Sequence, residues 1–125
     1  MSALAVVHEW IARINRRDLA GLVDVMTEDH VFFVDGEQST VGRVDMEKAW
    51  RGYFDAFPAY RILEDDHVER GGTVFVIGHT TGSHVPRPAE LIAGCVIWKA
   101  VVRSGQLAEW SIFDATPANR ARLGL

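Results

Sequence analysis

The sequence has a single cysteine, Cys95, so no disulfide can form within the chain. It also lacks an apolar run of the roughly 20 residues that a membrane-spanning helix needs. The first ten residues carry no basic segment, and His8 and Glu9 interrupt their apolar run, which argues against a secretory signal or an anchor. The net charge of −4 provides no basic face for nucleic acid. We therefore expect a cytoplasmic protein without a membrane or nucleic-acid partner.

Motifs for nucleotides, covalent catalysis and metals are also missing. There is no P-loop and no dinucleotide fingerprint, since Gly71-Gly72 stands alone and is typical of a hairpin. No Ser-His-Asp or Cys-His grouping is present, and Cys95 lies in an apolar run where a small buried side chain is expected. His8, His30 and His67 do not have the spacing of a zinc site. We expect no cofactor and no metal.

The chain does contain enough apolar material for one folded domain, residues 1–125. Hydrophobic residues make up 48% of the sequence and charged residues 24%, as in ordinary globular proteins. A chain of 125 residues can bury a core without disulfides or metals. Four tryptophans and six phenylalanines are a heavy aromatic load, and aromatic side chains line small-molecule pockets as well as cores.

Apolar periodicity predicts three helices in the first half of the chain. Residues 3–16 carry apolar side chains at i, i+3, i+4 and i+7, which form one face of a helix. Asp18 is suited to cap a second helix that begins at Leu19. A third helix is expected over residues 45–57, and Pro58 should end it.

The remaining segments favour strands. Residues 31–34 form a short β-prone run that ends at the turn sequence Asp35-Gly36. Four further strands are expected over 60–70, 73–84, 92–103 and 107–114, joined at Gly71-Gly72, at a Pro86–Pro88 loop and at Ser104-Gly105. These four strands should form one antiparallel meander, and a short helix should follow Pro117. Helices followed by strands indicate an α+β fold.

Side chains alternate across a strand, so parity assigns them to the two faces of the sheet. Trp98 and Ala100 share the face that we expect to meet the helices. On the last strand Trp110, Ile112 and Asp114 share a face by the same rule. An acid on an otherwise apolar face is an informative exception, so Asp114 is a candidate functional residue.

Several short phrases, spread over nearly the whole chain, resemble one superfamily. They are Arg13-Ile14-Asn15 with Asp18-Leu19, Met26-Thr27-Glu28-Asp29-His30-Val31, Gly42-Arg43 before a helix containing Trp50 and Phe54, and Gly105-Gln106-Leu107 with Glu109-Trp110 and Asp114. They resemble the nuclear transport factor 2-like superfamily, and within it the SnoaL-like proteins, which include polyketide cyclases. The resemblance implies a cone-shaped α+β barrel, with three N-terminal helices packed on a curved, mainly antiparallel, cystatin-like sheet. Because this superfamily includes enzymes, binding proteins and association domains, function must be argued from the site.

Ketosteroid isomerases share this fold and use an Asp base with an oxyanion hole made by a Tyr and a protonated Asp. By this resemblance Asp35 matches the place of the base. Trp10 stands where that family has its tyrosine, and Ile97 or Trp98 stands where it has the second acid. The oxyanion hole is thus absent, and steroid isomerase activity is not expected. In SnoaL-like cyclases an acid on the last strand serves in acid–base catalysis, and Asp114 lies about there.

Asp35 and Asp114 are the best candidate pair for catalysis. Two carboxyl groups in one apolar cavity resist ionisation through desolvation and mutual repulsion, so one can act as acid while the other acts as base. The alternative is that Asp35 caps its turn and Asp114 ends the last strand at the surface. His79 and His84 are five positions apart on one expected strand, so they point to opposite faces, and either one could lie in the cavity as a proton shuttle. We name His79 as the candidate, with a structural or exposed role as the alternative for both histidines.

The expected cavity wall is aromatic, and core packing alone could account for any single member of it. Three helices closing on a curved sheet leave a void, which inward polar groups turn into a ligand site. Tyr53 could supply a hydroxyl that orients a carbonyl group. The residues expected to line the cavity are Trp10, Phe33, Trp50, Tyr53, Phe54, Phe57, Trp98, Trp110 and Ile112.

Three functions stay open at this point. The chain could be a cyclase or isomerase that transfers protons on a small apolar carbonyl compound. It could be a binding or carrier domain with the same pocket, or a protein-association module. We also expect a homodimer through the outer face of the sheet, because apolar and basic residues mix there in a way that suits a two-fold contact. The outer-face residues are Phe75, Ile77, Ile97, Lys99, Val101 and Arg103.

Overall fold

The computed structural model describes all residues from Met1 to Leu125. It has an α+β architecture in which helices cover a six-stranded sheet with strand order β2-β1-β6-β5-β4-β3. The elements are α1 (Ala3–Asn15), α2 (Leu19–Val25), β1 (Met26–Val34), β2 (Glu37–Val41), α3 (Arg43–Ala56), β3 (Arg61–Arg70), β4 (Thr73–Thr81), α4 (Arg87–Glu90), β5 (Val96–Arg103), β6 (Gln106–Asp114) and α5 (Pro117–Leu123). The predicted fold class is confirmed. None of the helices combines the length and the apolar composition of a membrane span.

The three N-terminal helices form where the sequence predicts them. The hydroxyl of Ser2 accepts a hydrogen bond from the Ala5 N–H and caps α1. The carboxylate of Asp18 accepts a hydrogen bond from Gly21 and caps α2, as expected. The third helix, α3, begins two residues earlier than predicted and ends at Ala56, just before Pro58.

Residues 60–114 form the predicted antiparallel meander, in which β3, β4, β5 and β6 pair in sequence. Several details of the sheet and its connections differ from the prediction: β1 begins at Met26 and not at residue 31, β4 already ends at Thr81, and β5 begins only at Val96. A single helical turn, α4, lies in the connection expected to be a loop. A further strand, β2, pairs with β1 across the Asp35-Gly36 turn, and it was missed because its residues, EQSTV, are mostly polar and exposed. Strand β1 also pairs with β6 in parallel, so the sheet is mixed.

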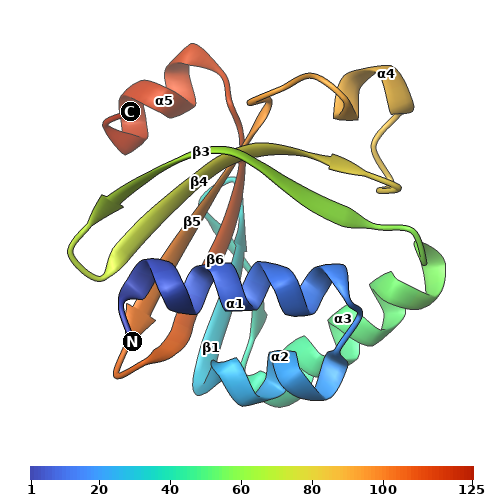
Figure 1. Ribbon diagram of the computed structural model, residues 1–125, viewed down its shortest axis with the longest axis vertical. Coiled ribbons are helices and arrows are strands. Elements are labelled where there is room, and N and C mark those ends of the chain that lie inside the picture. Colours follow the sequence, from blue (N-terminus) through green and yellow to red (C-terminus); the bar gives the residue numbers. More distant parts are fainter.

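The helices divide the covered face of the sheet between them. Helix α1 contacts β3, β4, β5 and β6, whereas α3 contacts mainly β1 and β2. Figure 1 shows α1, α2 and α3 on one side of the curved sheet and α5 on the opposite side. The main core lies under the N-terminal helices and includes the fully buried rings of Trp10, Trp98 and Trp110. Trp98 and Trp110 stack with their planes 13° apart.

The amide side chain of Asn15 joins the end of α1 to the edge of the sheet. It donates to the carbonyl of Ile62 at 2.9 Å and accepts from the N–H of Ile62 at 2.8 Å. The guanidinium of Arg17 adds a hydrogen bond to the carbonyl of Tyr60. Because β3 is an edge strand, these bonds satisfy backbone groups that would otherwise lack a partner.

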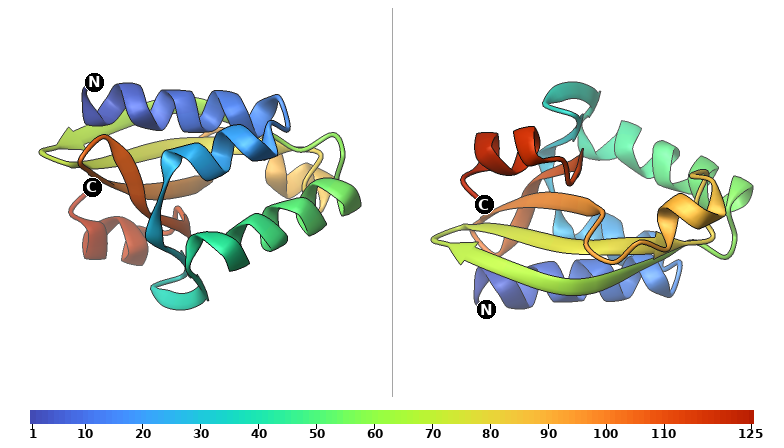
Figure 2. Two further views of the ribbon diagram at one scale, coloured as in Figure 1. Left: turned by 90° about the horizontal axis from the view of Figure 1, so that it is seen from below. Right: turned by 90° about the horizontal axis from the view of Figure 1, so that it is seen from above.

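The outer face of the sheet is partly covered within the chain itself. Helix α5 and the C-terminus, through Leu123 and Leu125, pack on a second small core of four buried residues. Both views of Figure 2 show α5 across the sheet from α1. The core residues are Phe75, Ile77, Ile97 and Phe113.

This covering corrects the reasoning behind the expected homodimer, which assumed that helices protect only one face. Phe75, Ile77 and Ile97 are buried by the chain's own C-terminus and are not available to a partner. Of the apolar residues named for the interface, only Val101 remains partly exposed. The homodimer stays a prediction, now without its main support.

Gly78 should be intolerant of any side chain. A Cβ atom there would overlap the carbonyl oxygen of Leu63, because β3 bulges over this point of β4. We expect Gly78→Ala to lower the free energy of unfolding by about 1–3 kcal/mol, the usual cost of overpacking. Urea unfolding would measure the loss, with Gly52→Ala as the control, since a Cβ on Gly52 meets nothing within 4 Å. Equal stability of both variants would contradict this account.

Stability should fall on acidification because of His30. This residue is fully buried, and burial lowers the pKa of its imidazole below 6.5, although the Leu107 carbonyl and Asp29 oppose the shift. The unfolded chain therefore takes up a proton at a higher pH than the folded chain. The free energy of unfolding should be constant above about pH 6.5 and then fall by up to about 1.4 kcal/mol per pH unit as far as the folded-state pKa.

Urea unfolding as a function of pH tests this prediction. His30→Asn can keep the hydrogen bond from the Nδ1 position to the Leu107 carbonyl, which is 2.8 Å in the wild type, and it cannot titrate. Its stability should be lower overall, with a smaller slope below pH 6.5. A wild-type slope in His30→Asn would assign the effect to another group.

Candidate functional site

A cavity of about 490 Å³ lies between α3 and the covered face of the sheet. It forms where α3 packs against β1 and β2, while α1 covers the other strands. Thirteen of its twenty lining residues are hydrophobic. The lining residues are Phe32, Val34, Asp35, Ser39, Thr40, Met46, Ala49, Trp50, Tyr53, Tyr60, Thr80, Ser83, His84, Val85, Val96, Trp98, Trp110, Ile112, Phe113 and Asp114.

Five of the nine residues expected to line the cavity do so. Trp50 and Tyr53 come from α3, Trp98 from β5, and Trp110 and Ile112 from β6. Trp50 and Trp98 are almost fully buried, so they form the inner wall. The predicted aromatic wall is therefore largely present, and it can enclose a flat apolar molecule.

The other four expected wall residues lie elsewhere. Trp10 and Phe54 are buried in the core, and Phe57 packs against that core from its edge. Phe32, and not Phe33, lines the cavity. Phe32 pairs with Trp110, which faces inward, whereas Phe33 pairs with Ser111 on the other face of the sheet. The sequence could not show which of two adjacent phenylalanines faces inward until this pairing was known.

Two buried indole N–H groups have no hydrogen-bond partner. They belong to Trp10 and Trp50, whose rings lie 6.0 Å apart. Trp10 does not line the cavity, so it cannot take the role of the isomerase tyrosine whose place it occupies. Trp50 does line it, which makes its N–H a candidate donor to a bound molecule.

Tyr53 and His84 form the main polar pair in the cavity wall. The phenol oxygen of Tyr53 lies 2.8 Å from Nδ1 of His84, and the backbone N–H of His84 donates to the same oxygen at 3.3 Å. With Nδ1 as the acceptor, the neutral imidazole carries its proton on Nε2. Burial raises the pKa of the Tyr53 phenol, although its hydrogen bond from the His84 backbone opposes this. The phenol is therefore neutral at physiological pH and can donate a hydrogen bond.

The loop that carries His84 is held by Glu90, which is only 4% exposed. Its carboxylate accepts hydrogen bonds from the Thr80 hydroxyl, from the N–H groups of Gly82 and Ser83, and from the Ser83 hydroxyl. Burial opposes ionisation, but these donors outweigh it and lower the pKa of Glu90. The buried charge thus fixes the cavity-lining turn from residue 82 to residue 85. The sequence did not predict that Glu90 holds this loop, because its hydrogen-bond partners lie seven to ten residues away across a turn.

Asp35 and Asp114 lie together at the mouth of the cavity. Asp35 follows β1 and Asp114 is the last residue of β6, which runs parallel to β1, and the N–H of Asp35 donates to the carbonyl of Ile112 at 3.0 Å. Parity along β6 holds, since no register shift occurs between Ser111 and Asp114. Both aspartates are nevertheless exposed, and Asp35 accepts a hydrogen bond from Arg122 of α5 at 3.2 Å. This exposure corrects the expectation of two carboxyl groups desolvated inside an apolar cavity.

His79 lies on the face of the sheet away from the cavity. It follows Phe75 and Ile77 at steps of two, and both of these residues belong to the outer core. Its Nδ1 lies 2.8 Å from the carboxylate of Asp65, and this contact lowers the pKa of Asp65. The expectation that His79 shuttles protons in the cavity is corrected, and His84 is the histidine that lines it.

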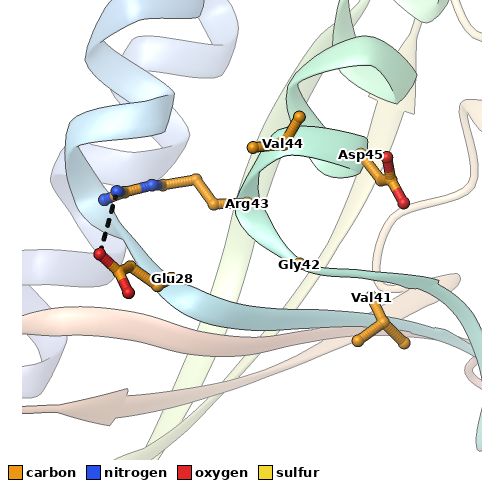
Figure 3. A pocket seen from close by; sticks show the side chains of 6 residues that line it. All are labelled: Glu28, Val41, Gly42, Arg43, Val44 and Asp45. Atoms are coloured by element: carbon orange, nitrogen blue, oxygen red, sulfur yellow. Dashed lines mark ion pairs between the residues drawn. The ribbon is translucent and has the colours of Figure 1, made fainter.

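A second recess, of about 360 Å³, opens beside the start of α3. Figure 3 shows the Arg43 side chain reaching across it toward Glu28, at 3.8 Å. Its other lining residues are Val41, Gly42, Val44 and Asp45, most of them exposed. It has no aromatic wall and no buried polar group, so the larger cavity is the better candidate site.

Comparisons with known structures agree with this fold. A cystatin-fold protein from Novosphingobium aromaticivorans superposes with a TM-score of 0.76 at 19% identity, covering 90% of this chain and 98% of its own. A protein from Sinorhizobium meliloti, provisionally described as a polyketide cyclase, gives 0.73 at 15% identity, with 90% and 100% covered. IdmH from Streptomyces antibioticus, also provisionally a polyketide cyclase, gives 0.69 at 18% identity, with both chains fully covered.

These identities are low, so the likeness shows a cystatin-like, nuclear transport factor 2-like fold and nothing more specific. No curated protein matches the chain in sequence. The profile of the SnoaL-like domain, in contrast, matches residues 7–110, from within α1 to the middle of β6. The chain therefore belongs to the SnoaL-like domain family.

Proposed function

We propose that this chain binds a small, mostly apolar carbonyl compound in the cavity and catalyses proton transfer on it without a cofactor, as a cyclase or isomerase would. The observation that carries the proposal is the cavity itself, which has an apolar aromatic wall, a hydrogen-bonded Tyr53–His84 pair and a carboxylate at its mouth. Such a cavity orients a ligand through few polar groups. The relatives described as polyketide cyclases support the same reaction class.

In the proposed reaction the carboxylate of Asp114 removes a proton from the carbon next to the carbonyl. The negative charge moves to the carbonyl oxygen, where Tyr53 stabilises it by a hydrogen bond. The phenol proton can turn from Nδ1 of His84 to the substrate oxygen, while the backbone N–H of His84 still donates to the phenol oxygen. In an isomerisation the proton returns at another carbon. In a cyclisation the carbanion bonds to a second carbonyl carbon, whose oxygen takes the proton.

A binding domain without chemistry is the second candidate, and one observation favours it. Both aspartates are exposed, and Asp35 is engaged by Arg122, so neither is held in the desolvated setting that activates many catalytic carboxylates. The two candidates share the cavity and differ in whether Asp114 reacts. They can therefore be separated by one substitution.

Hydrogen–deuterium exchange next to the carbonyl of 2-tetralone tests the proton transfer. This bicyclic ketone is small enough for the cavity, and NMR in deuterated water follows the exchange. The wild-type chain should accelerate it over buffer, and Asp114→Asn should lower the rate by at least ~100-fold, the low end for general acid–base catalysis. Asp35→Asn is the matched control at the same mouth and should have a smaller effect. If ketone binds without any acceleration, the binding-domain candidate is correct.

Glu90→Gln should test whether the loop is held by the buried carboxylate. The amide places an N–H₂ group against N–H and O–H donors, so we expect the free energy of unfolding to fall by about 1–3 kcal/mol. Binding of 2-tetralone, followed by Trp fluorescence, should weaken because His84 and Ser83 lose their fixed positions. Glu37→Gln, at an exposed position of β2, should leave stability and binding unchanged. Full stability of Glu90→Gln would contradict the role of Glu90.

A further inference from the structure

His8, Glu64 and His67 converge on the surface where α1 lies beside the edge strand β3. Nε2 of His8 lies 3.1 and 3.2 Å from the two carboxylate oxygens of Glu64. Nδ1 of His67 lies 3.7 Å from the nearer of these oxygens. One ligand atom from each of the three side chains falls within 4.8 Å of the others. The two imidazole rings meet edge to face, with centroids 5.8 Å apart.

A β-bulge in β3 brings two of these residues to the same face. Glu64 and His67 are three positions apart, so in a regular strand they would point to opposite faces. Asp65 is the extra residue of the bulge, since Glu64 pairs with Gly78 and Asp66 with the next residue, Ile77. His67 consequently lies opposite Val76, a core residue under α1, and shares the face of Glu64. Glycine at position 78 leaves room for the bulge.

We propose that His8, Glu64 and His67 form a binding site for a divalent cation of the zinc class. Two imidazole nitrogens and one carboxylate oxygen are a donor set that zinc accepts, with water completing four-coordination. Metal–ligand bonds of about 2.0–2.2 Å place tetrahedral ligands about 3.3–3.6 Å apart. The distances from Glu64 to the two histidines lie close to that spacing. Small side-chain rotations at this exposed site can bring the three ligand atoms to the distances that a bound cation requires.

The site differs from the cavity in position and in chemistry. Its side chains are partly exposed, 46% for His8, 27% for Glu64 and 38% for His67, so water has access to the remaining coordination positions. The residues come from two elements already joined by packing and by the Asn15 amide. The cation would link α1 to β3. Because the unfolded chain lacks this grouping, bound metal would stabilise the fold.

Calorimetric titration of Zn²⁺ into chelator-treated protein at pH 7.5 tests the proposal. We expect one site with a micromolar-range dissociation constant, weakened at least ~10-fold in His67→Asn and in Glu64→Gln. The melting temperature should rise with Zn²⁺ in the wild type and not in these variants. All three side chains are partly exposed, so the variants should fold, which circular dichroism verifies.

His79→Asn is the matched control, because the His79–Asp65 pair lies on the other face of the same bulge. It should bind Zn²⁺ as the wild type does. Loss of binding in His79→Asn with retention in His67→Asn would overturn the proposal in favour of that pair. Wild-type affinity in the His8→Asn/His67→Asn double variant, or no heat of binding to the wild type, would overturn it outright.

Discussion

The packing of the Trp10 ring is the contact on which the rest of the structure depends. The side chain is fully buried, and its ring lies within about 6 Å of the rings of His30, Trp50 and Trp110. It therefore joins α1 to β1, α3 and β6 at one point. Aromatic pairs of this kind add to the free energy of burial beyond their area. Because Trp50 and Trp110 continue into the cavity wall, the same cluster that stabilises the core also shapes the candidate site.

Most of the fold could be predicted from sequence because its elements have strong periodic signals. The apolar stripe of α1, the Asp18 cap and the hairpin glycines placed the helices and the meander nearly where they occur. The missed parts lack such signals. Strand β2 is polar and exists because β1 offers it an edge. The short helix predicted after Pro117 is present as α5, but its packing over the outer core could not be foreseen. Both depend on tertiary contacts, which local propensity does not report.

The candidate site was predictable on regular strands and not at their irregular points. Parity placed Trp98, Trp110 and Ile112 correctly, because β5 and β6 pair without a shift through that region. Parity gives the face of a side chain but not its depth, so Asp114 proved to share the face of Ile112 and still be exposed at the strand's end. Whether Phe33 or its neighbour faces the cavity could not be predicted, because the pairing of β1 was unknown. The role of Glu90 could not be predicted either, because no sequence pattern indicates the hydrogen bonds of the turn that it holds.

The bulge at Asp65 shows how one extra residue in a strand can bring together side chains whose spacing in the sequence does not suggest a site. His8 and His67 are 59 positions apart in the chain, and the pair Glu64 and His67 has the wrong parity for a regular strand. The bulge restores a shared face, and helix α1 supplies the third group. His8 and Trp10 are two positions apart, hence about 200° around the helix, so they project from nearly opposite sides of α1. A cation held by His8 would thus tighten α1 against β3 without entering the cavity. Its effect on ligand binding would have to pass through the position of Trp10, the ring that supports the cavity wall.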